Sequence, residues 1–167
     1  MNLNQSEFHS NGHKILILGI GNYVMGDEGV GVHFVRKLES ENTFKNKEIT
    51  VLDGGTGGFL LVPYLEAHPY VIIVDATMDE QPLGTISLLK PKFSSDFPTS
   101  LSAHDFGLKD MVEILTLFDR MPVIFLYTVS IEEIKPMNVG MSKKVEEALP
   151  LVLEKVKNTV KEIEKRL

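Results

Sequence analysis

The side chains best suited to chemistry are four carboxylates and one histidine near the ends of apolar runs. Asp27 and Glu28 lie side by side in the glycine-rich stretch GIGNYVMGDEGVG. Asp53 and Asp75 each follow an apolar run, and His104 lies in SLSAHDFGL. Two carboxylates and one imidazole suit a divalent metal with open coordination positions. We therefore take Glu28, Asp75 and His104 as a candidate metal site.

Each of these residues also has a purely structural interpretation. Asp27 and Glu28 can serve as ordinary acids at a helix N-terminus, where Asp is a good N-cap and negative charge suits the helix dipole. Asp75 can cap the turn that follows its strand. A single histidine such as His104 is commonly a hydrogen-bonded structural residue. We interpret the other histidines as structural or solvent-exposed: His9, His13, His33 and His68.

The glycine-rich turn is also compatible with a dinucleotide site. Gly19 and Gly21 match the first two glycines of GxGxxG, but Val24 occupies the third position. Asp53 stands where a ribose-binding acid would be expected. A pyrophosphate needs a helix N-terminus without competing anions, and here two acids occupy it. A dinucleotide-binding oxidoreductase therefore remains an alternative that the acids disfavour.

Short β-branched runs alternate with segments of helical period, which is typical of an α/β fold with a mainly parallel sheet. The short connection before residues 85–89 predicts an antiparallel strand at an edge of the sheet. Functional groups of such sheets lie at the carboxyl ends of the strands. We expect strands at 14–20, 48–52, 70–75, 85–89 and 123–128, and helices at 27–40, 57–67, 105–118 and after Ser142.

Apolar residues at helical spacing define the helix faces that we expect to be buried. Pro150 is a point where the last helix can kink or restart. We expect residues 1–13 to form a flexible arm and residues 14–167 to form a single α/β domain. The predicted buried faces comprise Val30, Phe34, Val35 and Leu38; Leu108, Met111, Val112, Leu115 and Phe118; and Val145, Leu149, Val152, Val156, Val160, Ile163 and Leu167.

Composition excludes several classes of site. The chain has 167 residues, a net charge of −6 and no cysteine, with a pI of about 5.4. Without cysteine it cannot form disulfides, iron–sulfur clusters, thiolate zinc sites or a cysteine nucleophile. The acidic balance argues against nucleic-acid partners. We find no signal peptide and no apolar run long enough to span a membrane, and therefore expect a soluble cytoplasmic protein.

The ordered motifs resemble those of the nickel–iron hydrogenase maturation endopeptidases. The pattern GxGNxxxxDEGxG, which ends at Gly31, resembles the opening motif of this family. Three further pieces follow in the family's order, and the resemblance covers about residues 14–155. One departure lies in Thr128–Pro136, where family members commonly have a glycine. The three further pieces are Asp53-Gly54-Gly55-Thr56, Asp75-Ala76 and Ser102-Ala103-His104-Asp105-Phe106-Gly107-Leu108.

The resemblance implies a three-layer α/β fold, in which helices flank a twisted, mixed, mainly parallel five-stranded sheet. It also implies an enzyme that removes a C-terminal peptide from the hydrogenase large-subunit precursor after nickel insertion. Its nickel-sensing residues map onto Glu28, Asp75 and His104. The precursor would supply the nickel, and another divalent cation can occupy the site in vitro.

Two mechanisms remain open at this point. In metal-assisted hydrolysis, Asp27 or Asp53 would orient the attacking water. In an aspartic-type mechanism, the carboxylates would form an acid–base pair. The alternatives in function are a non-catalytic nickel-sensing assembly chaperone, another hydrolase on the same architecture, and the dinucleotide-binding oxidoreductase.

Overall fold

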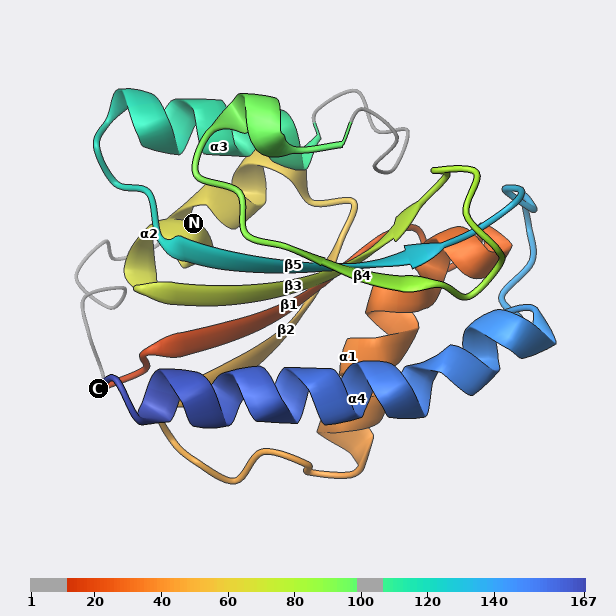
Figure 1. The fold of residues 1–167 in the computed structure, drawn as a ribbon, viewed down its shortest axis with the longest axis horizontal. Coiled ribbons are helices and arrows are strands. Elements are labelled where there is room, and N and C mark those ends of the chain that lie inside the picture. Colours follow the sequence, from red (N-terminus) through yellow and green to blue (C-terminus); the bar gives the residue numbers. More distant parts are fainter. Residues whose placement is uncertain (1–11, 99–106) are drawn as a thin grey trace, which may run out of the picture.

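Five strands form one twisted sheet in the order β2-β1-β3-β5-β4 (Figure 1). The computed structural model describes residues 12–98 and 107–167. The first four strands in this order are parallel, and β4 runs antiparallel to β5 at the edge. The predicted fold class and the antiparallel edge strand are therefore confirmed. The strands are β1 (Ile15–Ile20), β2 (Ile49–Gly55), β3 (Tyr70–Thr77), β4 (Ile86–Leu89) and β5 (Val123–Ser130).

Helices cover both faces of the sheet and make the fold three-layered (Figure 1). The α-helices are α1 (Val30–Ser40), α2 (Val62–Ala67), α3 (Leu108–Leu117) and α4 (Lys143–Glu164). Short 3₁₀ turns precede α1, α2 and α3 along the chain: η2 (Gly26–Gly29), η3 (Gly58–Leu61) and η4 (Ser94–Asp96).

Each face of the sheet has its own hydrophobic core, because successive side chains of a strand point to opposite faces. Ile15 and Ile17 of β1 belong to the core under α1 and α4. Leu16 and Leu18 belong to the core under α2 and α3. Strands β1 and β3 are almost completely buried, which explains why their sequences are continuous apolar runs rather than alternating ones.

The sequence predicts the type of every main element, and the differences lie at their ends. Phe118 is 67% exposed and Leu167 is 52% exposed, so the prediction that they are buried is wrong. Their helices end at Leu117 and Glu164, and residues beyond a helix end no longer follow its buried face. Helix α4 continues through Pro150 without interruption.

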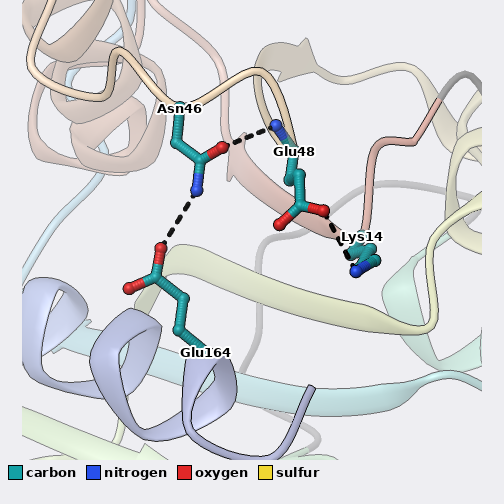
Figure 2. Close-up of polar contacts among 4 residues, drawn as sticks. All are labelled: Lys14, Asn46, Glu48 and Glu164. Atoms are coloured by element: carbon teal, nitrogen blue, oxygen red, sulfur yellow. Dashed lines mark hydrogen bonds and ion pairs between the residues drawn. The ribbon is translucent and has the colours of Figure 1, made fainter.

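Polar contacts at the amino end of β1 connect distant parts of the chain (Figure 2). Asn46, in the connection before β2, donates a side-chain hydrogen bond of 3.1 Å to Glu164 near the end of α4. Lys14 forms a 3.0 Å ion pair with Glu48. Among the described residues, no helix combines the length and apolar character needed to cross a membrane.

Candidate active site at the carboxyl ends of the strands

Four glycines allow the turn between β1 and α1 to fold tightly on itself. A Cβ atom on Gly19 would lie 2.1 Å from the carbonyl oxygen of Gly31, and one on Gly31 would lie 2.2 Å from that of Val74. A Cβ on Gly21 would lie 2.2 Å from the carbonyl oxygen of Glu28, and one on Gly29 would lie 2.8 Å from that of Asn22. These glycines therefore allow the turn and the neighbouring strand to approach closely.

Glu28 lies in the 3₁₀ turn η2 and is 3% exposed. Its Oε2 accepts a hydrogen bond from the backbone N–H of Asn22, six residues earlier in the turn. Turn η2 packs against β3, so Glu28 is held beside the central strand of the sheet. Burial of a carboxylate is unfavourable unless donors or a cation balance its charge, and this makes the position suitable for a metal ligand.

Asp75 lies near the carboxyl end of β3 and is fully buried. Its Oδ1 accepts a 2.8 Å hydrogen bond from the N–H of Ala76. Because Val71 and Ile73 belong to the core under α2 and α3, the alternation of the strand places Asp75 on that same face. Helix α3, whose Leu108, Met111 and Leu115 belong to this core, lies on the same side of the sheet.

Asp27 is turned away from Glu28, toward helix α4. Its Oδ1 accepts a 2.6 Å hydrogen bond from the N–H of Ser142, the residue that precedes α4. The interpretation of Asp27 as the N-cap of its own helix is therefore wrong: Gly29 is the N-cap of α1, and the Asp27 carboxylate bonds instead to the residue that precedes α4. A shallow pocket of about 200 Å³ lies at this contact, lined by Asp27, Lys135, Asn138, Gly140, Met141 and Ser142.

Asp53 belongs to the extended part of β2, opposite Gly19 of β1, rather than to a turn after the strand. Its Oδ2 forms a 2.7 Å ion pair with Arg36 on α1, and its Oδ1 accepts a hydrogen bond from Gly55. This partnership raises the pKa of the Arg36 guanidinium. Arg36 also stacks over the ring of Tyr23 at 4.1 Å. Sequence reasoning missed Arg36, which lies on the exposed side of a helix.

The third predicted ligand, His104, lies outside the described residues, as does most of the SAHDFGL motif. No group of three possible metal ligands occurs among residues 12–98 and 107–167. The predicted set of Glu28, Asp75 and His104 therefore remains a prediction. Among the other histidines, burial lowers the pKa of both His33 and His68, and the ring of His68 bonds to Tyr64 and Thr50.

The connection between β5 and α4 is the part of the site that sequence reasoning missed. Met25 forms a parallel β-bridge with Asn138, so this connection lies directly against the glycine-rich turn. The sequence of the polar stretch before Ser142 does not predict this contact, because the bridge joins residues that are far apart in the sequence. The Oγ of Ser142 is buried without a hydrogen-bond partner in the described part of the chain.

The fold and these carboxylates define an α/β protein with an acidic site at the carboxyl ends of its parallel strands. A family model for hydrogenase maturation proteases (HycI) matches residues 32–159. The chain is 30% identical over 152 residues to the hydrogenase 2 maturation protease of Escherichia coli (strain K12), covering 89% of this chain and 92% of that protein.

Solved structures agree with this match. The hydrogenase maturating endopeptidase HybD of E. coli superimposes with a TM-score of 0.80 at 30% identity, covering 89% of this chain and 93% of that one. The [NiFe] hydrogenase maturation protease HybD of Thermococcus kodakarensis shares the fold, with a TM-score of 0.71 at 23% identity over 87% and 98% of the two chains. The protein belongs to the hydrogenase maturation protease family and is a peptidase.

Proposed function

We propose that this peptidase makes one cut in the precursor of a nickel–iron hydrogenase large subunit and removes a C-terminal peptide. The cut requires nickel in the precursor and takes place in the cytoplasm. The family membership supports the substrate class. The observation that supports the dependence on nickel is the burial of two carboxylates, Glu28 in η2 and Asp75 near the end of β3. Glu28 is 3% exposed and Asp75 is 0% exposed.

The ligand set that we propose is Glu28, Asp75 and His104. Carboxylate oxygen and imidazole nitrogen both suit nickel, and three protein ligands leave positions for groups of the substrate or for water. Nickel enters with the substrate, so the precursor contributes both the metal and the scissile bond. The protein would therefore cut only precursor that has already received its metal.

Hydrolysis then needs a group that orients water beside the scissile carbonyl. The bound nickel would polarise that carbonyl or lower the pKa of the water. Asp27 and Asp53 are the candidate carboxylates from the sequence. We propose Asp53 for this role, because it lies at the carboxyl end of β2 with 27% of its side chain exposed, whereas Asp27 faces the start of α4.

A processing assay tests this function. Nickel-loaded and nickel-free precursor are incubated with the wild type and with Glu28→Gln, Asp75→Asn and His104→Ala, and the mass of the subunit is read by mass spectrometry. Glu48→Gln is the matched control, because it makes the same chemical change in an exposed ion pair with Lys14. We expect loss of one C-terminal peptide only with nickel, in the wild type and the control.

The other outcomes separate the alternatives. Binding of the precursor without a change in mass would indicate an assembly chaperone. Equal cleavage of nickel-free precursor would contradict the proposed role of nickel and favour an aspartic-type acid–base pair. No interaction at all would direct attention back to the dinucleotide site.

A further inference from the structure

The carboxylate of Asp27 connects the glycine-rich turn to a helix that lies 115 residues further along the chain. Asp27 is 8% exposed, and its bond to Ser142 N–H measures 2.6 Å. Within the described residues, the side chain of Ser142 makes no capping bond of its own to α4. Asp27 therefore satisfies an N–H group that this helix leaves open and places negative charge at its positive end.

Main-chain hydrogen bonds hold the same two segments together beside this contact. The N–H of Gly26 donates to the carbonyl of Asn138 at 2.7 Å, and the N–H of Asn138 donates to the carbonyl of Val24 at 3.0 Å. The N–H of Lys135 donates to the carbonyl of Met25 at 3.3 Å. The β5–α4 connection thus runs along residues 24–26, and Asp27 is the side chain that extends this contact.

The geometry of a 3₁₀ turn couples the direction of Asp27 to that of Glu28. Such a turn has about three residues per turn, so neighbouring side chains diverge by about 120°. With Asp27 directed at α4, Glu28 is directed back toward the N–H of Asn22, which its carboxylate accepts. Glycines at positive φ precede the acids, Gly21 at 138° and Gly26 at 65°. Because glycine restrains the backbone weakly, contacts from outside the turn must fix it.

We propose that Asp27 is a positioning residue, which fixes the orientation of the Glu28 carboxylate by bonding to the N-terminus of α4. This role needs a hydrogen-bond acceptor at position 27 and no proton transfer. The inference rests on the proposed function, because only there is Glu28 a ligand of the substrate's nickel. It differs from the catalytic role that the sequence suggested for Asp27, in which the carboxylate itself would orient water.

The first test measures the orientation of Glu28 without any substrate. The amide of Asn22 bonds to Glu28, so its hydrogen exchange and proton shift, followed by NMR, report whether this contact persists. We expect Asp27→Ala to speed exchange of the Asn22 amide about tenfold or more, because one charged hydrogen bond is lost. Asp27→Asn keeps an acceptor for Ser142 and should stay within about threefold of the wild type. An Asn22 amide unchanged in Asp27→Ala would overturn the proposal.

Ser142→Pro removes the same hydrogen bond from its other end. Ser142 has φ −63°, which suits proline, and proline lacks the N–H that Asp27 accepts. If both changes act through this one bond, exchange of the Asn22 amide in the double variant should be no faster than in the faster of the two single variants. Additive effects would contradict the proposed coupling.

A cleavage assay with nickel-loaded precursor separates positioning from catalysis. We expect Asp27→Asn to cut within about threefold of the wild-type rate and Asp27→Ala to cut at least about tenfold more slowly. Thr159→Val is the control for a general loss of stability, because Thr159 lies toward the C-terminal end of α4, far along the helix from Ser142, and bonds there to Tyr127 of β5. The control should cut at the wild-type rate.

If the Asp27→Asn variant cleaves the precursor as slowly as Asp27→Ala, the proposal is overturned, and the negative charge of Asp27 would have a direct catalytic role. If the wild type itself fails to cut the precursor, the proposed function fails. The amide measurement would still decide whether Asp27 positions Glu28, so the two failures can be told apart.

Discussion

At the scale of single residues, Gly31 shows how little space separates α1 from the sheet. A Cβ atom there would lie 2.2 Å from the carbonyl oxygen of Val74 and 2.4 Å from that of Ile20. Both are backbone atoms of buried strands, which cannot move aside cheaply. We expect Gly31→Ala to lower the free energy of unfolding by about 3 kcal/mol, measured by urea denaturation.

Gly107→Ala is the matched control for this change. Gly107 has φ −86°, and among the described residues a Cβ atom there would meet a side-chain oxygen of Asp110 at the ordinary contact distance of 3.8 Å. Because Gly107 is the N-cap of α3, where alanine is less favourable than glycine, its effect should stay within about 1 kcal/mol. A Gly31→Ala variant as stable as this control would show that the helix can shift away from the sheet.

Residues also mark the limit of what the sequence could predict about the site. The chemistry of Asp27, Glu28, Asp53 and Asp75 follows from residue type and position at strand ends. Their partners do not, because those contacts join distant parts of the chain: Asp27 is 115 residues from Ser142, and Asp53 is 17 residues from Arg36. The tertiary structure determines the hydrogen-bond partner of such a side chain, and the local sequence pattern does not reveal it.

At the scale of elements, periodicity predicted strands and helices well because it reflects burial, which is strong in this fold. Residues 70–75 form a strand as expected, and the strand continues to Thr77 because it pairs with β5 as far as Ser130. Strand β2 likewise extends through Gly55 by pairing with β1 across a register shift next to Gly19. Strand ends therefore depend on the neighbouring strand, whereas strand centres can be read from their own sequence.

His68 connects two elements and should make their packing sensitive to pH. Its Nδ1–H donates to the carbonyl of Tyr64 on α2 at 2.7 Å, and its Nε2 accepts from the hydroxyl of Thr50 on β2 at 3.1 Å. Burial lowers the pKa of His68 below its ordinary value of 6.5, and nearby His13 acts in the same direction. Below about pH 6.5 the unfolded chain therefore binds a proton that the folded protein resists, so stability falls as pH falls.

We expect the free energy of unfolding, measured in urea at pH 8, 6.5 and 5, to decrease toward low pH. The contribution of one histidine cannot exceed about 1.4 kcal/mol per pH unit. His68→Gln should flatten this slope but leave the part that comes from His33. The pKa of His33 is also lowered, mainly by burial, with Arg36 and Glu146 acting in opposite directions. An unchanged slope in His68→Gln would show that His68 is not the group responsible.

At the scale of the whole molecule, the proposed function requires the protein to bind nickel-loaded precursor and afterwards to release a product that keeps its metal. The chain has no cysteine, so no thiolate can strengthen a site of two carboxylates and one imidazole. A site of moderate affinity fits this task, because tight binding would compete with the substrate for the metal. The enzyme would then hold nickel firmly only while the precursor supplies the remaining ligands.

We therefore expect the purified protein, after treatment with a chelator and gel filtration, to contain far less than one nickel per chain by elemental analysis. Titration calorimetry should give weak nickel binding that Asp75→Asn weakens further, because the variant loses a charged ligand. Asp79→Asn is the control, since Asp79 lies in the turn between β3 and β4 and accepts a local hydrogen bond from the N–H of Gln81. One nickel per chain that survives chelation would show that the metal belongs to the enzyme, and the cut would then no longer depend on nickel brought by the precursor.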